Sequence, residues 1–262
     1  MNRKTHLFSC RILLIVSIFL FGLCAHLMAA DNVGSVNYYS DMMNDEAYSA
    51  LLKYVFDGNP MEGMDGLYDN LEKHMASAGY EEWKKDSFLA RGALICAKYA
   101  NDCKEKDIAR SYMEIADRKI ADTRTSGAPE SAVGVLEALS FSFWYLVDGS
   151  LSKGMKFPRM VDDLYEEHPE DFHVLLLEAD RYLHSPGIVG GNKKKGLQLY
   201  QEAEKRMNES GAAEWDRFSI YAGLAFGYDS RKDKENAEKY TLLASEIYTA
   251  DETVDKLLKK YR

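Results

Sequence analysis

Residues 221–244 read YAGLAFGYDSRKDKENAEKYTLLA, and this stretch decides the fold. Small and aromatic side chains recur in it at helical spacing, on both sides of a polar segment at 229–236. These residues are Tyr221, Leu224, Ala225, Tyr228, Ala237 and Ala244. Residues three or four apart lie on one face of an α-helix. Small side chains on such a face let two helix backbones approach closely. The stretch therefore predicts two antiparallel helices joined by a short turn.

Two other stretches share this spacing. The first has the same spacings without the aromatics, and the second has five extra residues in its turn. Their residues are Ala93, Cys96, Ala97, Ala100, Ala109, Met113 and Ala116, and then Ala179, Tyr182, Gly196, Tyr200 and Ala203. All three stretches resemble the tetratricopeptide repeat (TPR), although Thr241 stands where that family has an aromatic. The resemblance implies an all-α fold, an antiparallel helix-hairpin (TPR-like) solenoid. The alternative is a generic bundle with alanine at packing positions.

The rest of the chain also favours helices. It has only five prolines, and no convincing run alternates apolar with polar residues. Helices are predicted at 44–56, 62–78, 81–100, 104–122, 129–148, 154–167, 171–184, 192–208, 213–229, 232–247 and 251–260. Because the breaks between them are short, neighbouring helices should pack as antiparallel pairs.

The first thirty residues differ from the rest. Three basic residues and no acidic one occur there, and the run 12–23 is almost purely apolar but too short to span a membrane comfortably. This pattern predicts a signal peptide at 1–30 and a helical-repeat domain at 31–262, exported and periplasmic or envelope-associated. The alternative is an uncleaved N-terminal anchor. A lipid anchor at Cys24 is a further alternative, disfavoured because Leu23 rather than a small residue precedes it.

The net charge of residues 31–262 excludes some classes of binding partner. Without residues 1–30 the chain keeps 30 basic and 42 acidic residues, a net charge of -12. Such a surface repels nucleic acid and anionic membranes, so neither is a predicted partner. Cys96 and Cys103 remain in this region. They could form a disulfide if the chain turns between them at Asn101-Asp102, or else one is a buried helical cysteine and the other an exposed thiol.

The segment 184–196 (HSPGIVGGNKKKG) is an enlarged turn. Pro186, Gly190 and Gly191 would shape it, because glycine tolerates positive φ. A proline, a Gly-Gly turn and a charged run that opens a helix resemble a group of exported bacterial TPR-like proteins. The T component associated with TRAP-type solute transporters is one of them. That resemblance covers residues 171–207. It implies a periplasmic protein that serves a transporter or binds an apolar ligand.

Aromatic residues are the predicted ligand or partner contacts. They are Phe141, Trp144, Tyr145, Tyr182, Tyr221 and Tyr228. The first three crowd one predicted helix, which is either central to the core or the wall of an apolar groove. The tyrosines at 221 and 228 have the same two interpretations, and exposed tyrosines there would suit peptide docking.

No motif indicates catalysis. The sequence has no Gly-x-Ser-x-Gly elbow, no HExxH and no zinc-ligand spacing, so we expect neither an enzyme nor a cofactor or metal. The predicted function is an extracytoplasmic binding or scaffolding protein that docks a protein, a peptide or an apolar small molecule. The alternative is a TRAP-transporter accessory protein with an enclosed apolar cavity.

Overall fold

The computed structural model describes residues 36–39 and 42–261. The chain divides into two units, Met1–Ser35 and Val36–Arg262, and the description below concerns the second. The predicted signal peptide at 1–30 and the cysteine at 24 therefore lie outside the described residues. Within the described part, no helix is both long and apolar enough to cross a membrane.

The described residues confirm the all-α class. The α-helices are α2 (Glu46–Phe56), α3 (Met64–Ser77), α4 (Glu82–Asp102), α5 (Lys106–Thr125), α6 (Glu130–Asp148), α7 (Leu151–Glu167), α8 (Phe172–His184), α9 (Lys193–Ser210), α10 (Glu214–Ser230), α11 (Lys234–Ile247) and α12 (Glu252–Tyr261). Short 3₁₀ helices are η1 (Met42–Asn44), η2 (Met61–Gly63) and η3 (Gly187–Val189). The predicted ranges match these closely, and α7 begins three residues earlier than predicted.

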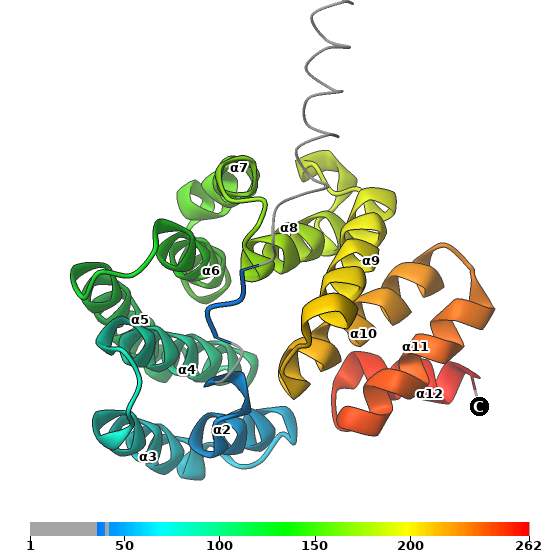
Figure 1. Cartoon of the computed structure of the whole chain (residues 1–262). Helices are drawn as coiled ribbons and strands as arrows, with labels where there is room; N and C mark the ends of the chain where they lie inside the picture. The colour runs from blue at the N-terminus through cyan, green and yellow to red at the C-terminus, as the bar shows by residue number, and fades with distance from the viewer. Residues whose placement is uncertain (1–35, 40–41, 262) are drawn as a thin grey trace, which may run out of the picture. The chain divides into compact units, whose positions relative to one another are not determined.

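Consecutive helices pack in pairs (Figure 1). Helix α4 packs on α5, α6 on α7, α8 on α9 and α10 on α11, and the first helices of successive pairs also touch one another. Glycine permits the close approach. A Cβ atom at Gly196 would lie 2.7 Å from the backbone nitrogen of Leu183, and one at Gly223 would lie 2.3 Å from Cζ of Tyr200. The small residues therefore act as predicted, while assignment to a TPR solenoid stays a prediction.

The first α-helix and the residue after it also contact α10 and the residue after α11. Trp215 on α10 donates its indole N–H to Oγ of Ser49 on α2 at 3.0 Å. The Tyr248 hydroxyl, just after α11, donates to Asp57 at 2.5 Å. Buried residues of α2 to α6 share one hydrophobic cluster with buried residues of α10, α11 and α12. A solenoid that stays open along its whole length would not make these contacts.

Residues 36–39 form a segment that we call the N-terminal strap. Val36 donates its N–H to the carbonyl of Glu170 at 3.0 Å and accepts one from Phe172 at 2.8 Å, which makes an isolated parallel bridge with the α7–α8 connection. Asn37 donates its side-chain amide to Asp216 on α10 at 3.2 Å, and Tyr39 is buried. The strap thus joins the α7–α8 connection to α10.

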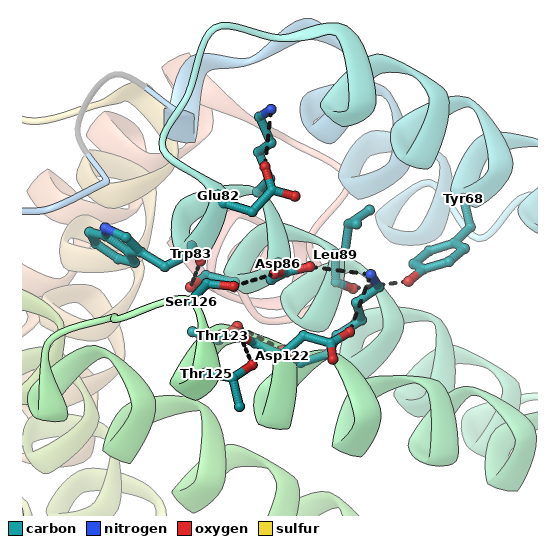
Figure 2. A network of polar contacts seen from close by, with 12 residues as sticks. Tyr68, Glu82, Trp83, Asp86, Leu89, Asp122, Thr123, Thr125 and Ser126 are labelled. Carbon is teal, nitrogen blue, oxygen red and sulfur yellow. Dashed lines mark hydrogen bonds and ion pairs between the residues drawn. The ribbon is translucent and has the colours of Figure 1, made fainter.

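A polar network joins the start of α4 to the end of α5 (Figure 2). The buried carboxylate of Asp86 accepts from Lys119 Nζ at 3.2 Å and from Ser126 Oγ at 3.1 Å. Thr123 donates to the carbonyl of Lys119 at 2.8 Å. Because these bonds fix the last turn of α5, they also fix Arg124, which bonds Glu137 on α6 at 2.5 Å.

Of the two alternatives for the cysteines, the structure shows the buried helical cysteine with an exposed thiol. Cys96 is buried inside α4, whereas Cys103 is exposed at the C-cap of the same helix, and both thiols are free. The turn expected at Asn101-Asp102 does not occur there, because α4 continues through Asp102. Seven helical residues separate the two Cα atoms by about 10 Å, beyond the reach of a disulfide.

Candidate ligand-binding groove

A groove of about 560 Å³ lies between α6 and α7 and is bounded at one side by the end of α5. Its size falls in the range of small-molecule sites. Its lining residues are Arg124, Glu130, Gly134, Glu137, Phe141, Met155, Lys156, Arg159, Met160, Asp163, Leu164, Glu167 and His168.

Helices α6 and α7 each line the groove with residues from one helical face. On α6, residues 130, 134, 137 and 141 recur every three or four positions and so share one face. Gly134 lies at the bottom of this face, where a Cβ atom would be 2.6 Å from Cδ1 of Leu164. The close contact of Gly134 with Leu164 brings the second half of α7 down onto α6. Only Val161 and Leu164 of α7 are buried.

The second half of α7 is also attached to α8. Arg181, which is buried, donates to Glu178 at 2.7 Å and also to Asp162 on α7. Burial raises the pKa of the Glu178 carboxyl above its ordinary value, although the Arg181 charge opposes this. Glu178 orients Arg181 within α8, and the bond from Arg181 to Asp162 attaches α7 to α8 beside the groove.

The first half of α7 exposes apolar side chains. Met155 is 80% exposed and Leu151 is 66% exposed. Leu146, which lies five residues before Leu151 on α6, is also exposed. Gly149, at φ +68°, ends α6 in the left-handed conformation and starts this hairpin turn. Large apolar residues gathered at one exposed place often mark a binding site.

The same segment is basic. Residues 149–161 contain Lys153, Lys156 and Arg159 and no acidic residue. Among the described residues Lys156 has no ion-pair partner, and Lys153 lies over the Trp144 ring at 4.6 Å. Arg159 makes only an exposed i,i+4 pair at 3.5 Å with Asp163, which is worth little in water. Lys156 therefore lies without an ion-pair partner beside exposed apolar surface, in a groove that Glu130, Glu137, Asp163 and Glu167 also line.

The three predicted aromatics of α6 contact different neighbours. Phe141 lines the groove. Trp144 donates its indole N–H to Asp117 at 2.9 Å, which holds it against α5. Tyr145 is exposed and packs over Gly154 of α7, where a Cβ atom would lie 2.7 Å from the ring. The predicted core position of this helix is thus only partly right, since its last turns are half-exposed.

The other predicted contacts lie elsewhere. Tyr182 lies between the charges of Arg181 and Lys195, at 3.8 and 4.0 Å from its ring centre. Tyr228 stacks on Tyr240 with ring centres 5.5 Å apart. Tyr221 lines a separate, more polar pocket of about 530 Å³ between α10 and α11. The six aromatics therefore do not form a single site.

The predicted structural turn lies before α9. Gly190 has φ +89°, and a Cβ atom at Gly191 would come within 1.8 Å of the carbonyl oxygen of Ser185. Pro186 precedes η3, whose Ile188 is 95% exposed. Asn192 caps α9 by accepting from two of its first N–H groups.

Sequence reasoning missed most of the groove. Met155, Lys156, Arg159, Met160 and His168 were given no role. The acid-free basic segment 149–161 is the signal that could have indicated them, because basic and apolar residues alternate there within an acidic chain. Among the described residues, no group of three or more histidines, cysteines or carboxylates could hold a bare metal ion.

Comparison with known proteins finds one similar structure. The sequence matches no family model and no curated protein. The structure is similar to that of the HusA haemophore from Porphyromonas gingivalis, with a TM-score of 0.54 and 19% sequence identity. The match covers 74% of this chain and 94% of that one. At this identity the similarity shows a shared all-helical fold.

Proposed function

We propose that this chain is an exported binding protein that holds a small, largely apolar ligand with acidic groups in the α6–α7 groove. The observation that carries the proposal is exposed apolar surface in a groove whose Lys156 has no ion-pair partner among the described residues, although the lining also holds the carboxylates Glu130, Glu137, Asp163 and Glu167. Met155 and Phe141 supply apolar surface, while Lys156 and Arg159 stand beside it. Apolar walls give affinity, and a few charged groups fix orientation.

Haem is the candidate ligand that the name of the structural neighbour suggests. The structural neighbour is named a haemophore, and haem is a flat apolar macrocycle that carries carboxylates and an iron ion. The groove offers Lys156 as a cation for a ligand carboxylate, whereas Arg159 already faces Asp163 and three further carboxylates line the same groove. It also offers Met155, Met160 and His168, which belong to the residue types that ligate haem iron. A macrocycle supplies most of the iron's ligands, so the protein needs to supply only one or two.

The two earlier functional predictions have less support. An accessory protein with an enclosed cavity does not match this open groove, whose Met155 is largely exposed to solvent. Peptide docking through Tyr221 and Tyr228 stays a prediction, since those tyrosines are half-buried and Tyr228 is stacked on a neighbouring ring.

The test is titration of residues 31–262 with haemin and with metal-free protoporphyrin IX, followed by absorbance and tryptophan fluorescence. The charge variant is Lys156→Glu. Its matched control is Lys205→Glu, an exposed lysine on α9 outside the groove. We expect saturable one-site binding of both ligands. Lys156→Glu should weaken both by about tenfold, because it replaces an attraction with a repulsion worth roughly 1–2 kcal/mol at short range.

Lys205→Glu should bind both ligands as the parent chain does. Equal weakening by the two variants would mean that net charge, and not the groove, governs binding. Absence of saturable binding by the parent chain would remove the proposal altogether.

A further inference from the structure

The turn before α9 carries two exposed apolar side chains in η3, Ile188 and Val189, which we call the η3 tip. Ile188 is 95% exposed and Val189 is 50% exposed. Backbone hydrogen bonds hold the turn, since Val189 and Gly191 both donate to the carbonyl of Pro186, at 3.0 and 3.1 Å. These bonds keep the tip away from the rest of its own chain, so its apolar surface can be removed from water only by another molecule.

The η3 tip lies in a basic part of an acidic chain. From position 181 to 201 the chain has four lysines and arginines and no acidic residue. Lys195 is engaged, because its Nζ lies 3.7 Å from the carboxylate of Glu178 on α8. Lys194, in the first turn of α9, is exposed and has no ion-pair partner among the described residues.

Lys193 is partly engaged. Its Nζ lies 5.6 Å from the ring centre of Phe226 on α10. Its charge also acts on Asp229, which Lys260 already bonds at 2.5 Å. Lys194 is therefore the lysine beside the η3 tip whose charge is most available to another molecule.

Helix α11 exposes a surface of opposite charge, which we call the α11 face. A depression of about 460 Å³ lies on it, lined by Glu235, Glu238, Lys239, Leu242, Leu243 and Glu246. These positions recur every three or four residues and so share one side of the helix. Leu242 is 49% exposed, and the three glutamates have no ion-pair partner within the described part of the chain. Lys239 lies over the Tyr240 ring, 4.6 Å from its centre. The face thus joins an exposed leucine to three glutamates and one lysine.

We propose that the η3 tip of one copy of this chain docks on the α11 face of a second copy. Ile188 and Val189 would cover Leu242, and Lys194 would face the glutamates. A second copy is the partner because each surface carries the charge that the other lacks, beside apolar side chains that water otherwise surrounds. Neither surface belongs to the α6–α7 groove, so this inference does not depend on the proposed function.

Two properties follow from the difference between the surfaces. The contact is heterologous, so a pair of copies keeps one free tip and one free face, and further copies can add in a row. The tip is also small, which predicts weak association that is seen only at high protein concentration.

The experiment is sedimentation velocity of residues 31–262 at concentrations from micromolar to about millimolar. The tip variant is Ile188→Glu and the face variant is Leu242→Glu, and both change an exposed side chain. The matched control is Leu151→Glu, which makes the same charge change at a side chain that is 66% exposed on α7. We expect the parent chain and the control to associate as concentration rises. Each test variant should associate at least about tenfold more weakly, because it removes an apolar contact and adds negative charge opposite or within an acidic face.

A mixture of the two test variants gives the sharpest result. The Leu242→Glu chain has an intact tip and the Ile188→Glu chain has an intact face, so the mixture should form pairs that grow no further. A parent chain that stays monomeric, or a mixture that forms no pairs, would overturn the proposal. So would association of both test variants like that of the control. Sedimentation of the monomeric parent chain with phosphatidylglycerol vesicles, lost in Ile188→Glu but kept in Leu242→Glu, would assign the tip to a lipid surface instead.

Discussion

Replacing Gly196 with alanine tests the close packing on which the fold depends. Gly196 lies in the first turn of α9 and faces Leu183 of α8. A new Cβ atom would lie 2.7 Å from the Leu183 nitrogen, 2.9 Å from its Cβ and 3.0 Å from its Cα. These are backbone or near-backbone atoms, so no side-chain rotation can relieve the overlap. The two helices would have to separate.

The expected cost is the difference of two effects. Overpacking of this kind costs about 1–3 kcal/mol. Alanine recovers up to about 1 kcal/mol because it is a better helix former than glycine. The net destabilisation should be about 1–2 kcal/mol, which lowers Tm by roughly 2–8 °C in a domain of this size.

The matched control is Gly66→Ala in α3, where a Cβ atom would meet nothing within 4 Å. There only the helix preference acts, so Tm should rise or stay level. Calorimetry or circular dichroism of the two variants beside the parent chain measures both effects. A rise in Tm for Gly196→Ala comparable to that of Gly66→Ala would refute the close approach of α8 and α9.

Three further predictions concern buried groups. Burial alone would raise the pKa of Asp216, but the charge of His173 and the hydrogen bonds to the carboxylate lower it below its ordinary value. Its stabilising contribution is therefore complete above about pH 4 and is lost as pH falls through the folded-state pKa, so urea unfolding of Asp216→Asn and the parent chain should converge in acid. Burial raises the pKa of the Cys96 thiol, so iodoacetamide at neutral pH should label Cys103 alone in residues 31–262, by mass spectrometry. Asp86→Ala should lower the urea unfolding free energy by about 2 kcal/mol, because it removes two hydrogen bonds to a buried carboxylate.

Each of these has a contrary outcome. A constant stability gap between Asp216→Asn and the parent chain from pH 7 to pH 3 would mean that the aspartate has no lowered pKa. Labelling of both cysteines without denaturant would place Cys96 at the surface. An unchanged unfolding midpoint for Asp86→Ala would show that the network of Figure 2 contributes nothing to stability.

The fold was predictable because its signals are local. Alanine and glycine at hairpin spacing indicate where helices approach, and a Cβ atom at Gly196 or Gly223 would lie within 3 Å of a backbone or aromatic atom of the neighbouring helix. Contacts distant in sequence were not predictable. No local pattern indicates that Trp215 bonds Ser49, or that the strap pairs with the α7–α8 connection.

The site was predicted only in part. Phe141 was identified from its aromatic neighbours. The contribution of α7 to the groove depends instead on apolar side chains that its first half leaves exposed, such as Met155. Periodicity cannot show this, because an amphipathic helix at an open edge has the same sequence pattern as one inside a pair. The isolated basic segment around Lys156 was the available clue, since its charge opposes that of the chain.

The N-terminal strap has a consequence for biosynthesis. Asn37 leaves the ribosome 179 residues before Asp216, its hydrogen-bond partner. At about 5–20 residues per second, that interval lasts roughly ten to forty seconds. Helix pairs such as α4–α5 can form in that time, and Tyr39 can pack on Phe88 of α4, but the hydrogen bonds of Val36 and Asn37 cannot form until α8 and α10 have been made. The first residues of the folded unit are thus among the last to reach their final positions, and a nascent chain stalled before α10 would leave them accessible to proteases and chaperones.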